Sequence, residues 1–242
     1  MIILRYIGAL AICCLIGVGC TEELLPYEQP NILFITVEGQ AWEDLPGTMP
    51  FLTMPALERI LNEGVVFRNH YANAPLDQPS RYTIVSGLYP HNHHLMEEGG
   101  NWLPDDAPVL MSELSDLGYY TLGVGKMNFR PWERKAGFDR KITAEGPGEN
   151  ASDTLKKDDY HAFLAEKGRS RYDYLSQLSD TKSPGVKTWP WDDGLSINAF
   201  IGQQACKAIC SDDSLKTHPW FMWVSFSGPR YPWLPLAKSF RY

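Results

Sequence analysis

The chain has 242 residues, a formal net charge of −7, a hydrophobic content of 44% and a charged content of 21%. This length is enough for one well-buried core or two small ones, and the composition is that of a globular protein. The acidic balance and the lack of any basic run exclude a general nucleic-acid binder, because no cluster of lysine and arginine supplies phosphate contacts.

The first 20 residues have the pattern of an export signal. A basic residue precedes an apolar run that stops at Cys20 and is shorter than the about 20 apolar residues of a transmembrane helix. Gly17 and Gly19 before Cys20 resemble a bacterial lipobox. We therefore expect residues 1–20 to be a lipoprotein signal peptide with Cys20 acylated; simple secretion or a membrane anchor are the alternatives. The protein would be exported and lipid-anchored to a bacterial membrane, periplasmic or at the cell surface.

A polar, proline-containing tether at residues 21–29 precedes a region in which strand and helix patterns alternate. In chain order, the expected elements are a buried strand at 31–37, a helix at 54–64, a short strand at 65–72, a short helix at 80–89, a helix at 107–118, a strand at 119–125, a helix at 158–168 within an irregular section, a helix at 196–210 and a buried strand at 219–226. This alternation predicts an α/β protein with a mainly parallel sheet.

In such sheets, functional side chains gather where the strands end at their carboxyl edges. Glu38 follows the first strand, Asp77 precedes the short helix at 80–89, Lys126 follows the strand at 119–125, and residues 227–233 follow the last strand. We therefore expect the chemistry of this protein at these four places.

Side chains elsewhere give weaker signals. Cys206 and Cys210 are four residues apart on a predicted helix, where a disulfide would be strained, so two small buried side chains are expected. Three histidines, His91, His93 and His94, invite a metal site, but no carboxylate or cysteine follows at ligand spacing. The eight tryptophans fill a core or, as the alternative, stack on sugars.

Several motifs in this order resemble the sulfatase family of the alkaline phosphatase superfamily, in its choline-sulfatase and phosphonate-hydrolase branch. They are "PNILFITVEGQ", "MPALERILNEGVVFRNHYANAP", "DQPSR" followed by "GLYPHNH", "GVGKMNF" followed by "GFD", and "PWFMWVSFSGPRYPWLP". The resemblance covers residues 30–242 and implies an alkaline-phosphatase-like fold, a mainly parallel sheet flanked by helices. It also implies a truncated domain, because the family's domain is about twice as long; a fragment, a broken gene or a covering partner would explain this.

The resemblance implies hydrolysis of a sulfate or phosphate monoester. In the family, a cysteine or serine is converted to formylglycine, whose hydrate attacks sulfur, while a calcium ion held by acidic residues polarises the sulfate. The implied partner is a sulfated or phosphorylated small molecule or glycan.

Asp77 occupies the position of the family's nucleophile. A carboxylate has neither a thiol nor a hydroxyl to oxidise, so formylglycine is not possible at Asp77. Asp77 could attack directly, as aspartate does in phosphatases that form acyl phosphates. The interpretation we favour is that Asp77 caps the short helix at 80–89, with partial metal binding as a second role.

The other family positions are also altered. Glu38 and Gly39 align with two adjacent acids of the metal site, which leaves Glu38 and Asp77 as metal ligands and predicts that calcium binding is weak or lost. The catalytic positions are Asp77, Arg81, Lys126, Asn128 and Arg230. Of these, Arg81 and Lys126 match the family, whereas Asn128 and Arg230 replace its two proton-donating histidines.

The sequence therefore predicts a sulfatase-family protein with impaired catalysis. The alternatives are an active sulfate or phosphate ester hydrolase, and a lipoprotein that binds sulfated glycans or acts as a scaffold without catalysis.

Overall fold

The computed structural model describes residues 29–46, 53–100, 102–145, 158–171, 173, 188–230 and 234–235. The chain divides into two compact units, Met1–Pro30 and Asn31–Tyr242. The predicted signal peptide and most of the predicted tether lie outside the described residues. In the described part, no helix is both long enough and apolar enough to cross a membrane.

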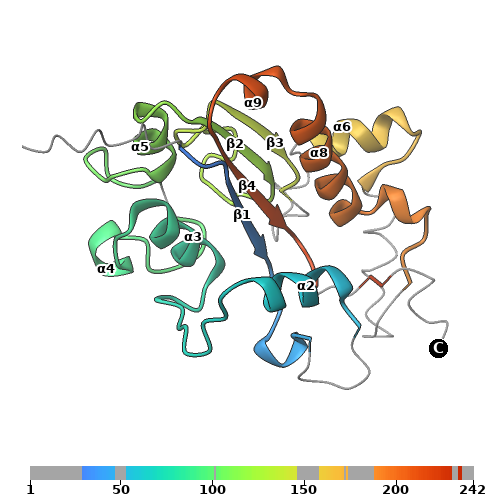
Figure 1. Ribbon diagram of the computed structural model, residues 1–242, viewed down its shortest axis with the longest axis horizontal. Helices are drawn as coiled ribbons and strands as arrows, with labels where there is room; N and C mark the ends of the chain where they lie inside the picture. Colours follow the sequence, from blue (N-terminus) through green and yellow to red (C-terminus); the bar gives the residue numbers. More distant parts are fainter. Residues whose placement is uncertain are drawn as a thin grey trace, which may run out of the picture. The chain divides into compact units, whose positions relative to one another are not determined.

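The centre of the second unit is a parallel sheet of four strands in the order β1-β4-β2-β3 (Figure 1). Val224 of β4 pairs with Ile35 of β1 on one side and with Val124 of β2 on the other, and Val124 pairs with Ile142 of β3. The strands are β1 (Ile32–Val37), β2 (Tyr120–Gly125), β3 (Arg140–Thr143) and β4 (Trp220–Phe226). The sequence predicted three of these strands and missed β3. The strand predicted at 65–72 is wrong, because these residues have no regular structure.

Helices are found at all five predicted places, with bounds that differ by a few residues. The described α-helices are α2 (Pro55–Glu63), α3 (Asp77–Ser86), α4 (Pro90–His93), α5 (Leu110–Asp116), α6 (Asp159–Glu166), α8 (Ile197–Ser211) and α9 (Asp213–Thr217), with 3-10 turns at η1 (Trp42–Asp44) and η3 (Asp193–Leu195). The short helices α4 and α9 were not predicted, because four or five residues are too few to display a helical period.

Helices cover both faces of the sheet, so the unit is a three-layer α/β/α structure (Figure 1). Successive side chains of a strand point to opposite faces, and β4 contributes to both cores. Met222 and Val224 pack with residues of α6, α8 and α9, whereas Phe221 and Trp223 pack with residues of α3 and α5. The fully buried Trp223 contributes about 1.5–3 kcal/mol to folding through its buried apolar area.

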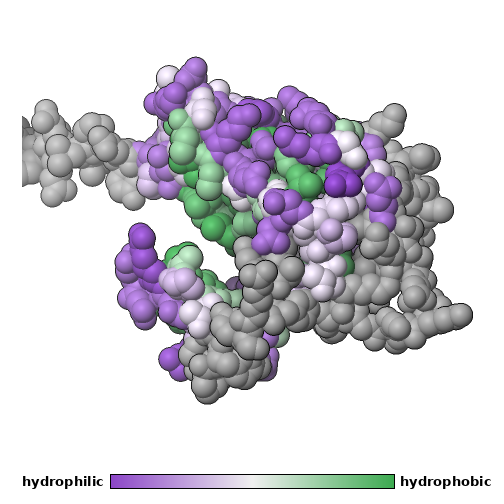
Figure 2. Space-filling view, turned by 90° about the vertical axis from the view of Figure 1, so that its right-hand side faces the viewer, coloured by the Kyte–Doolittle hydropathy of each residue, from purple (hydrophilic) through white to green (hydrophobic). Residues whose placement is uncertain are grey.

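Strand β1 is buried less than its sequence predicts. Its side chains alternate between half-buried and exposed, and Leu33, Ile35 and Val37 are all on the exposed side. Among the described strands, β1 pairs with β4 alone and is therefore an edge of the sheet. Hydrophobic residues also reach the surface beside a hollow on the face seen in Figure 2.

The two cysteines of α8 also differ from the prediction. Cys206 and Cys210 are both exposed, and they are not joined. The prediction that they fill the core is wrong, because the buried face of α8 consists of Phe200, Ile201 and two alanines.

Candidate functional site

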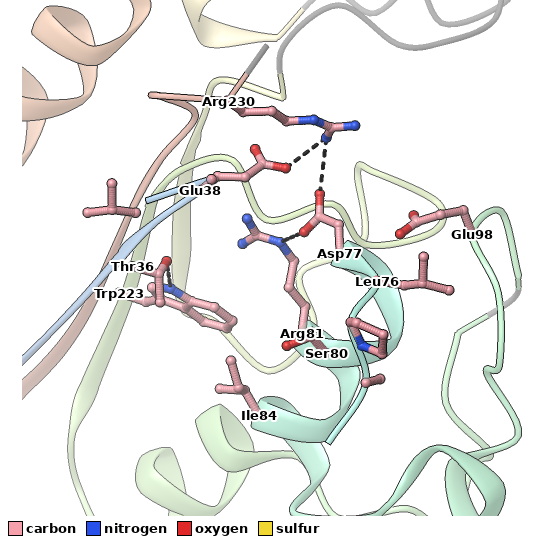
Figure 3. A pocket seen from close by; sticks show the side chains of 14 residues that line it. Thr36, Glu38, Leu76, Asp77, Ser80, Arg81, Ile84, Glu98, Trp223 and Arg230 are labelled. Carbon is pink, nitrogen blue, oxygen red and sulfur yellow. Dashed lines mark hydrogen bonds and ion pairs between the residues drawn. The ribbon is translucent and has the colours of Figure 1, made fainter. Parts of the chain in front are cut away.

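The carboxyl ends of β1, β2 and β4 meet at one place, as the sequence predicts. The backbone N–H of Glu38 donates to Phe226 at 3.1 Å, and that of Lys126 donates to Ser225 at 3.0 Å. These bonds hold the residues that follow β1 and β2 against the end of β4. The first turn of α3 brings Asp77 to the same place, so side chains far apart in the sequence form one site (Figure 3).

The centre of the site is an ammonium group between two carboxylates. Lys126 Nζ donates to Glu38 Oε1 at 2.7 Å, to Glu38 Oε2 at 2.9 Å and to Asp77 Oδ2 at 2.7 Å. The side chains of Lys126, Glu38 and Asp77 are only 9%, 12% and 15% exposed. Ionised groups that are buried to this extent require partners of opposite charge. The two carboxylates are these partners for the ammonium group.

Two arginines complete the arrangement. Arg81 lies one helical turn after Asp77 on α3, and its Nε donates to Asp77 Oδ1. Its Nη1 donates to the carbonyl of Lys126 at 2.8 Å and to Ser225 Oγ at 2.9 Å. Arg230 Nη1 donates to Glu38 Oε1 at 2.7 Å and lies 3.7 Å from Asp77 Oδ2 (Figure 3). We call Glu38, Asp77, Arg81, Lys126 and Arg230 the charged cluster.

Asn128 also binds Asp77. Its Nδ2 donates to Asp77 Oδ2 at 3.0 Å. Asn128 has a φ of +53°, a left-handed conformation that asparagine tolerates better than most residues. The structure therefore brings together every predicted site residue: Asp77, Arg81, Lys126, Asn128, Arg230 and Glu38.

A buried carboxylate that the sequence did not identify holds the loop of Lys126 and Asn128. Glu145 accepts the backbone N–H of Asn128 at 2.8 Å and that of Met127 at 3.3 Å. The backbone N–H of Glu145 donates to Asp158, which forms a buried ion pair with Arg171. Glu145 follows the end of β3, so recognition of that strand would have placed Glu145 at the site.

The favoured role of Asp77 as a helix cap is wrong. Helix α3 begins at Asp77 itself, Leu76 is at the N-cap position, and no side chain caps the helix there. The backbone N–H of Gln78 instead donates to Glu98 Oε1 at 3.0 Å. The carboxylate of Asp77 instead pairs with the cationic groups of Arg81 and Lys126, and these ion pairs take the place of a cap.

The neighbours of each carboxyl shift its pKa in a different direction. Burial by itself would raise the pKa of Asp77, but the charges of Arg81 and Lys126 lower it well below the usual range. Burial raises the pKa of Glu38, and Lys126 offsets part of this rise. Burial also raises the pKa of Glu145 despite the two backbone N–H groups that bind it.

The cluster does not provide the oxygen ligands of a calcium site. Calcium binds six to eight oxygens. All four carboxylate oxygens of Glu38 and Asp77 accept hydrogen bonds from nitrogen donors. In the described part of the chain, no group of three or more histidine, cysteine, aspartate or glutamate side chains could hold a metal. The donor set therefore does not fit the ion.

Gly39, just after β1, lies against the backbone of Arg230. Gly39 has a φ of +78°, and a Cβ at this residue would lie 2.9 Å from the Cα of Arg230. Any side chain there would meet backbone, which cannot move aside as a flexible side chain could.

A cavity of about 600 Å³ opens beside the charged cluster (Figure 3). Arg230, at 41% exposure, is the most accessible cation of the cluster. The rest of the wall is largely apolar and includes Val37, Leu76, Ile84 and Trp223, with Glu98 as a further acid. The cavity can therefore hold a ligand that has an anionic end and an apolar or uncharged body.

The histidines at 91–94 are not gathered as a metal site. His93 is buried, its Nε2 lies 3.2 Å from Thr83 Oγ1, and its Nδ1 accepts from the backbone of Leu95. His91 and His94 are exposed. Of the tryptophans, Trp189 and Trp223 are buried, as a role in the core predicts.

Comparison with known proteins places this chain in a family. The family model described as Sulfatase matches residues 30–238. A delta 4,5-hexuronate-2-O-sulfatase of Bacteroides thetaiotaomicron is 33% identical over 193 residues, which are 77% of this chain and 38% of that protein. A choline-sulfatase of Rhizobium meliloti is 26% identical over 219 residues, which are 87% of this chain and 40% of that protein.

Solved structures share the fold. A phosphonate monoester hydrolase of Agrobacterium radiobacter has a TM-score of 0.64 at 19% identity over 85% of this chain and 42% of its own. A protein solved with its substrate D-glucosamine-2-N,6-O-disulfate has a TM-score of 0.58 at 22% identity over 86% of this chain and 36% of its own. The chain thus spans less than half the length of these relatives.

Proposed function

The chain belongs to the sulfatase family, and from that premise we propose that it is a relative of the sulfuric ester hydrolases in which ester cleavage is impaired. The observation that carries this proposal is the state of Asp77. A carboxylate stands where the family has a cysteine or serine, and three nitrogen donors bind it. It cannot be oxidised to formylglycine, so the family's reaction cannot begin in the usual way.

Direct attack by Asp77 is also disfavoured. Both of its oxygens accept hydrogen bonds from cationic groups, which draw electron density away from the atoms that would attack. The lowered pKa of Asp77 has the same meaning, because a weaker base is in general a weaker nucleophile. The hydrogen bonds would have to break before the carboxylate could reach a sulfur or phosphorus atom.

The two positions expected to transfer protons are poorly suited to that role. Asn128 carries no titratable proton, and a guanidinium such as that of Arg230 holds its proton too firmly to act as a general acid. General acid–base catalysis contributes about 10²–10⁴-fold to rate where a suitable group is present. We propose that this contribution is lost here, and that the chain does not depend on calcium.

The proposed ligand is a sulfated or phosphorylated small molecule or glycan. Arg230 at the edge of the cavity is suited to bind an anion through two N–H groups, and the apolar wall is suited to the remainder of the ligand. The related structure with a disulfated glucosamine supports a sulfated sugar. We further propose that the protein is exported and attached to a bacterial membrane through Cys20.

Turnover measurements test the proposal. The full chain and its Asp77→Ala variant are assayed with 4-nitrophenyl sulfate and 4-nitrophenyl phosphate, and equal background rates are expected. Hydrolysis by the unchanged chain that disappears in the variant would show an active hydrolase and overturn the proposal. Calorimetry with sulfated glycans then tests binding, and no heat with any of them would leave only a scaffold.

A further inference from the structure

The donors around Asp77 converge on one point. Arg81 Nε, Lys126 Nζ and Asn128 Nδ2 all donate to the carboxylate of Asp77, and Arg230 Nη1 lies 3.7 Å from it. Three of these four groups are cationic, and they come from α3 and from the residues after β2 and β4. Such a ring of N–H donors is an oxyanion-binding site, and a carboxylate is an oxyanion.

Contacts that do not involve Asp77 hold the two buried cationic donors and the backbone of Asn128 in place. Arg81 is fixed by the carbonyl of Lys126 and by Ser225, and Lys126 is fixed by both oxygens of Glu38. The backbone of Asn128 is held by its N–H bond to the buried Glu145. Arg81 and Lys126 would therefore stay directed at this point if the side chain of Asp77 were shortened.

The charge of the cluster also favours an anion at this point. Three cationic side chains face two carboxylates, one of which is Asp77 itself. Without the carboxylate of Asp77, the excess of positive charge grows in a mostly buried place, where it is weakly screened. The cavity beside the cluster gives a small ion a route to this point, because Asp77 and Arg81 line it.

We propose that Asp77 is a tethered ligand that fills the oxyanion site of this chain, so that a free oxyanion enters only when the Asp77 carboxylate is removed. The inference rests on the proposed function and deepens it, because it assigns a second cause for impaired catalysis: the anionic group of a ligand is kept away from Arg81 and Lys126. A sulfate group of a bound ligand then contacts the site at Arg230.

Chemical rescue tests this assignment. The melting temperature of Asp77→Ala is measured against sodium sulfate and sodium formate, with sodium chloride keeping the ionic strength constant. The unchanged chain and Asp77→Asn are the controls, since asparagine fills the same space without a charge. Because sulfate stabilises most proteins weakly through exclusion from the surface, the signal is the difference from these controls, and formate checks it.

The expected result is a saturable rise for Asp77→Ala that exceeds the rise of both controls by about 5–10 °C when the anion is at 100 times its dissociation constant. Adding Lys126→Gln to Asp77→Ala should weaken the apparent affinity by at least tenfold. Equal rises in all three proteins, or a rescue that does not depend on Lys126, would overturn the assignment.

If Asp77→Ala does not fold in chloride, its refolding yield in sulfate and formate is the measurement. An equal yield in all three salts would also overturn the assignment. These outcomes are independent of ester turnover by the unchanged chain, so failure of the tethered-ligand assignment can be told from failure of the proposed function.

Discussion

Replacing Lys126 by methionine tests whether the charged cluster holds the site together. Methionine keeps most of the aliphatic length but removes three N–H···O contacts of 2.7–2.9 Å to Glu38 and Asp77. Removing one partner of a buried ion pair costs about 3–5 kcal/mol. Arg81 and Arg230 remain beside the two carboxylates, so we expect the low end of this range, about 3 kcal/mol.

Equilibrium unfolding in urea, followed by tryptophan fluorescence, measures this cost. The matched control is Lys216→Met, because Lys216 also forms an ion pair, with Asp213 at 2.8 Å, but on the surface. That variant should unfold almost as the unchanged chain does, since exposed pairs contribute little. A loss below about 1 kcal/mol for Lys126→Met, or an equal loss for both variants, would refute the reasoning.

Three further predictions concern the surroundings of the cluster. Glu145→Gln should destabilise the chain by about 1–2 kcal/mol in thermal unfolding, because an amide N–H would face a backbone N–H. Burial raises the pKa of Glu145 in the folded chain above 4.5. The unchanged chain should therefore lose stability as the pH rises from 4.5 towards that pKa. Glu145→Gln, which has no carboxyl group at this position, should not show this pH-dependent loss. Gly39→Ala should lower the melting temperature more than Gly168→Ala does. Both glycines have a positive φ, but an added Cβ would meet the backbone of Arg230 at Gly39, whereas it would have nothing within 4 Å at Gly168. An equal loss in the two variants would contradict this. EDTA and calcium chloride, added separately at about 5 mM each, should both leave the melting temperature unchanged. A calcium-dependent rise would show that the ion displaces Lys126.

The sequence predicts those helices and strands whose residue pattern is local and extends over enough residues to be recognised. Strand β4 is a largely apolar run, β2 contains aromatic and β-branched residues beside a leucine, and α8 extends over 15 residues, so each can be recognised from its local sequence. Strand β3 was missed because Arg140–Thr143 has a single large apolar residue, and pairing with β2 makes it a strand. Residues 65–72 are the opposite case, because their side chains favour a strand but none forms. In the described structure they pair with no strand and remain exposed.

The residues that form the site could be predicted from the sequence, but the contacts between them could not. Parallel strands place their carboxyl ends together whatever their sequences, which is why Glu38 and Lys126 were expected near each other. The helix-cap role of Asp77 was wrong because the competing partner, Lys126, is 49 residues away in the sequence. Glu145 was missed because a buried carboxylate that binds backbone N–H groups has no motif.

The whole arrangement depends on the carboxylate of Asp77 being held, ionised, by Arg81 and Lys126. A titration of its carboxyl carbon by ¹³C NMR tests this most directly, because the chemical shift reports the charge of this one group. The expected result is a pKa for Asp77 well below that of an ordinary aspartate and unchanged by calcium. An ordinary or raised pKa, or a shift of the resonance on adding calcium, would contradict the account.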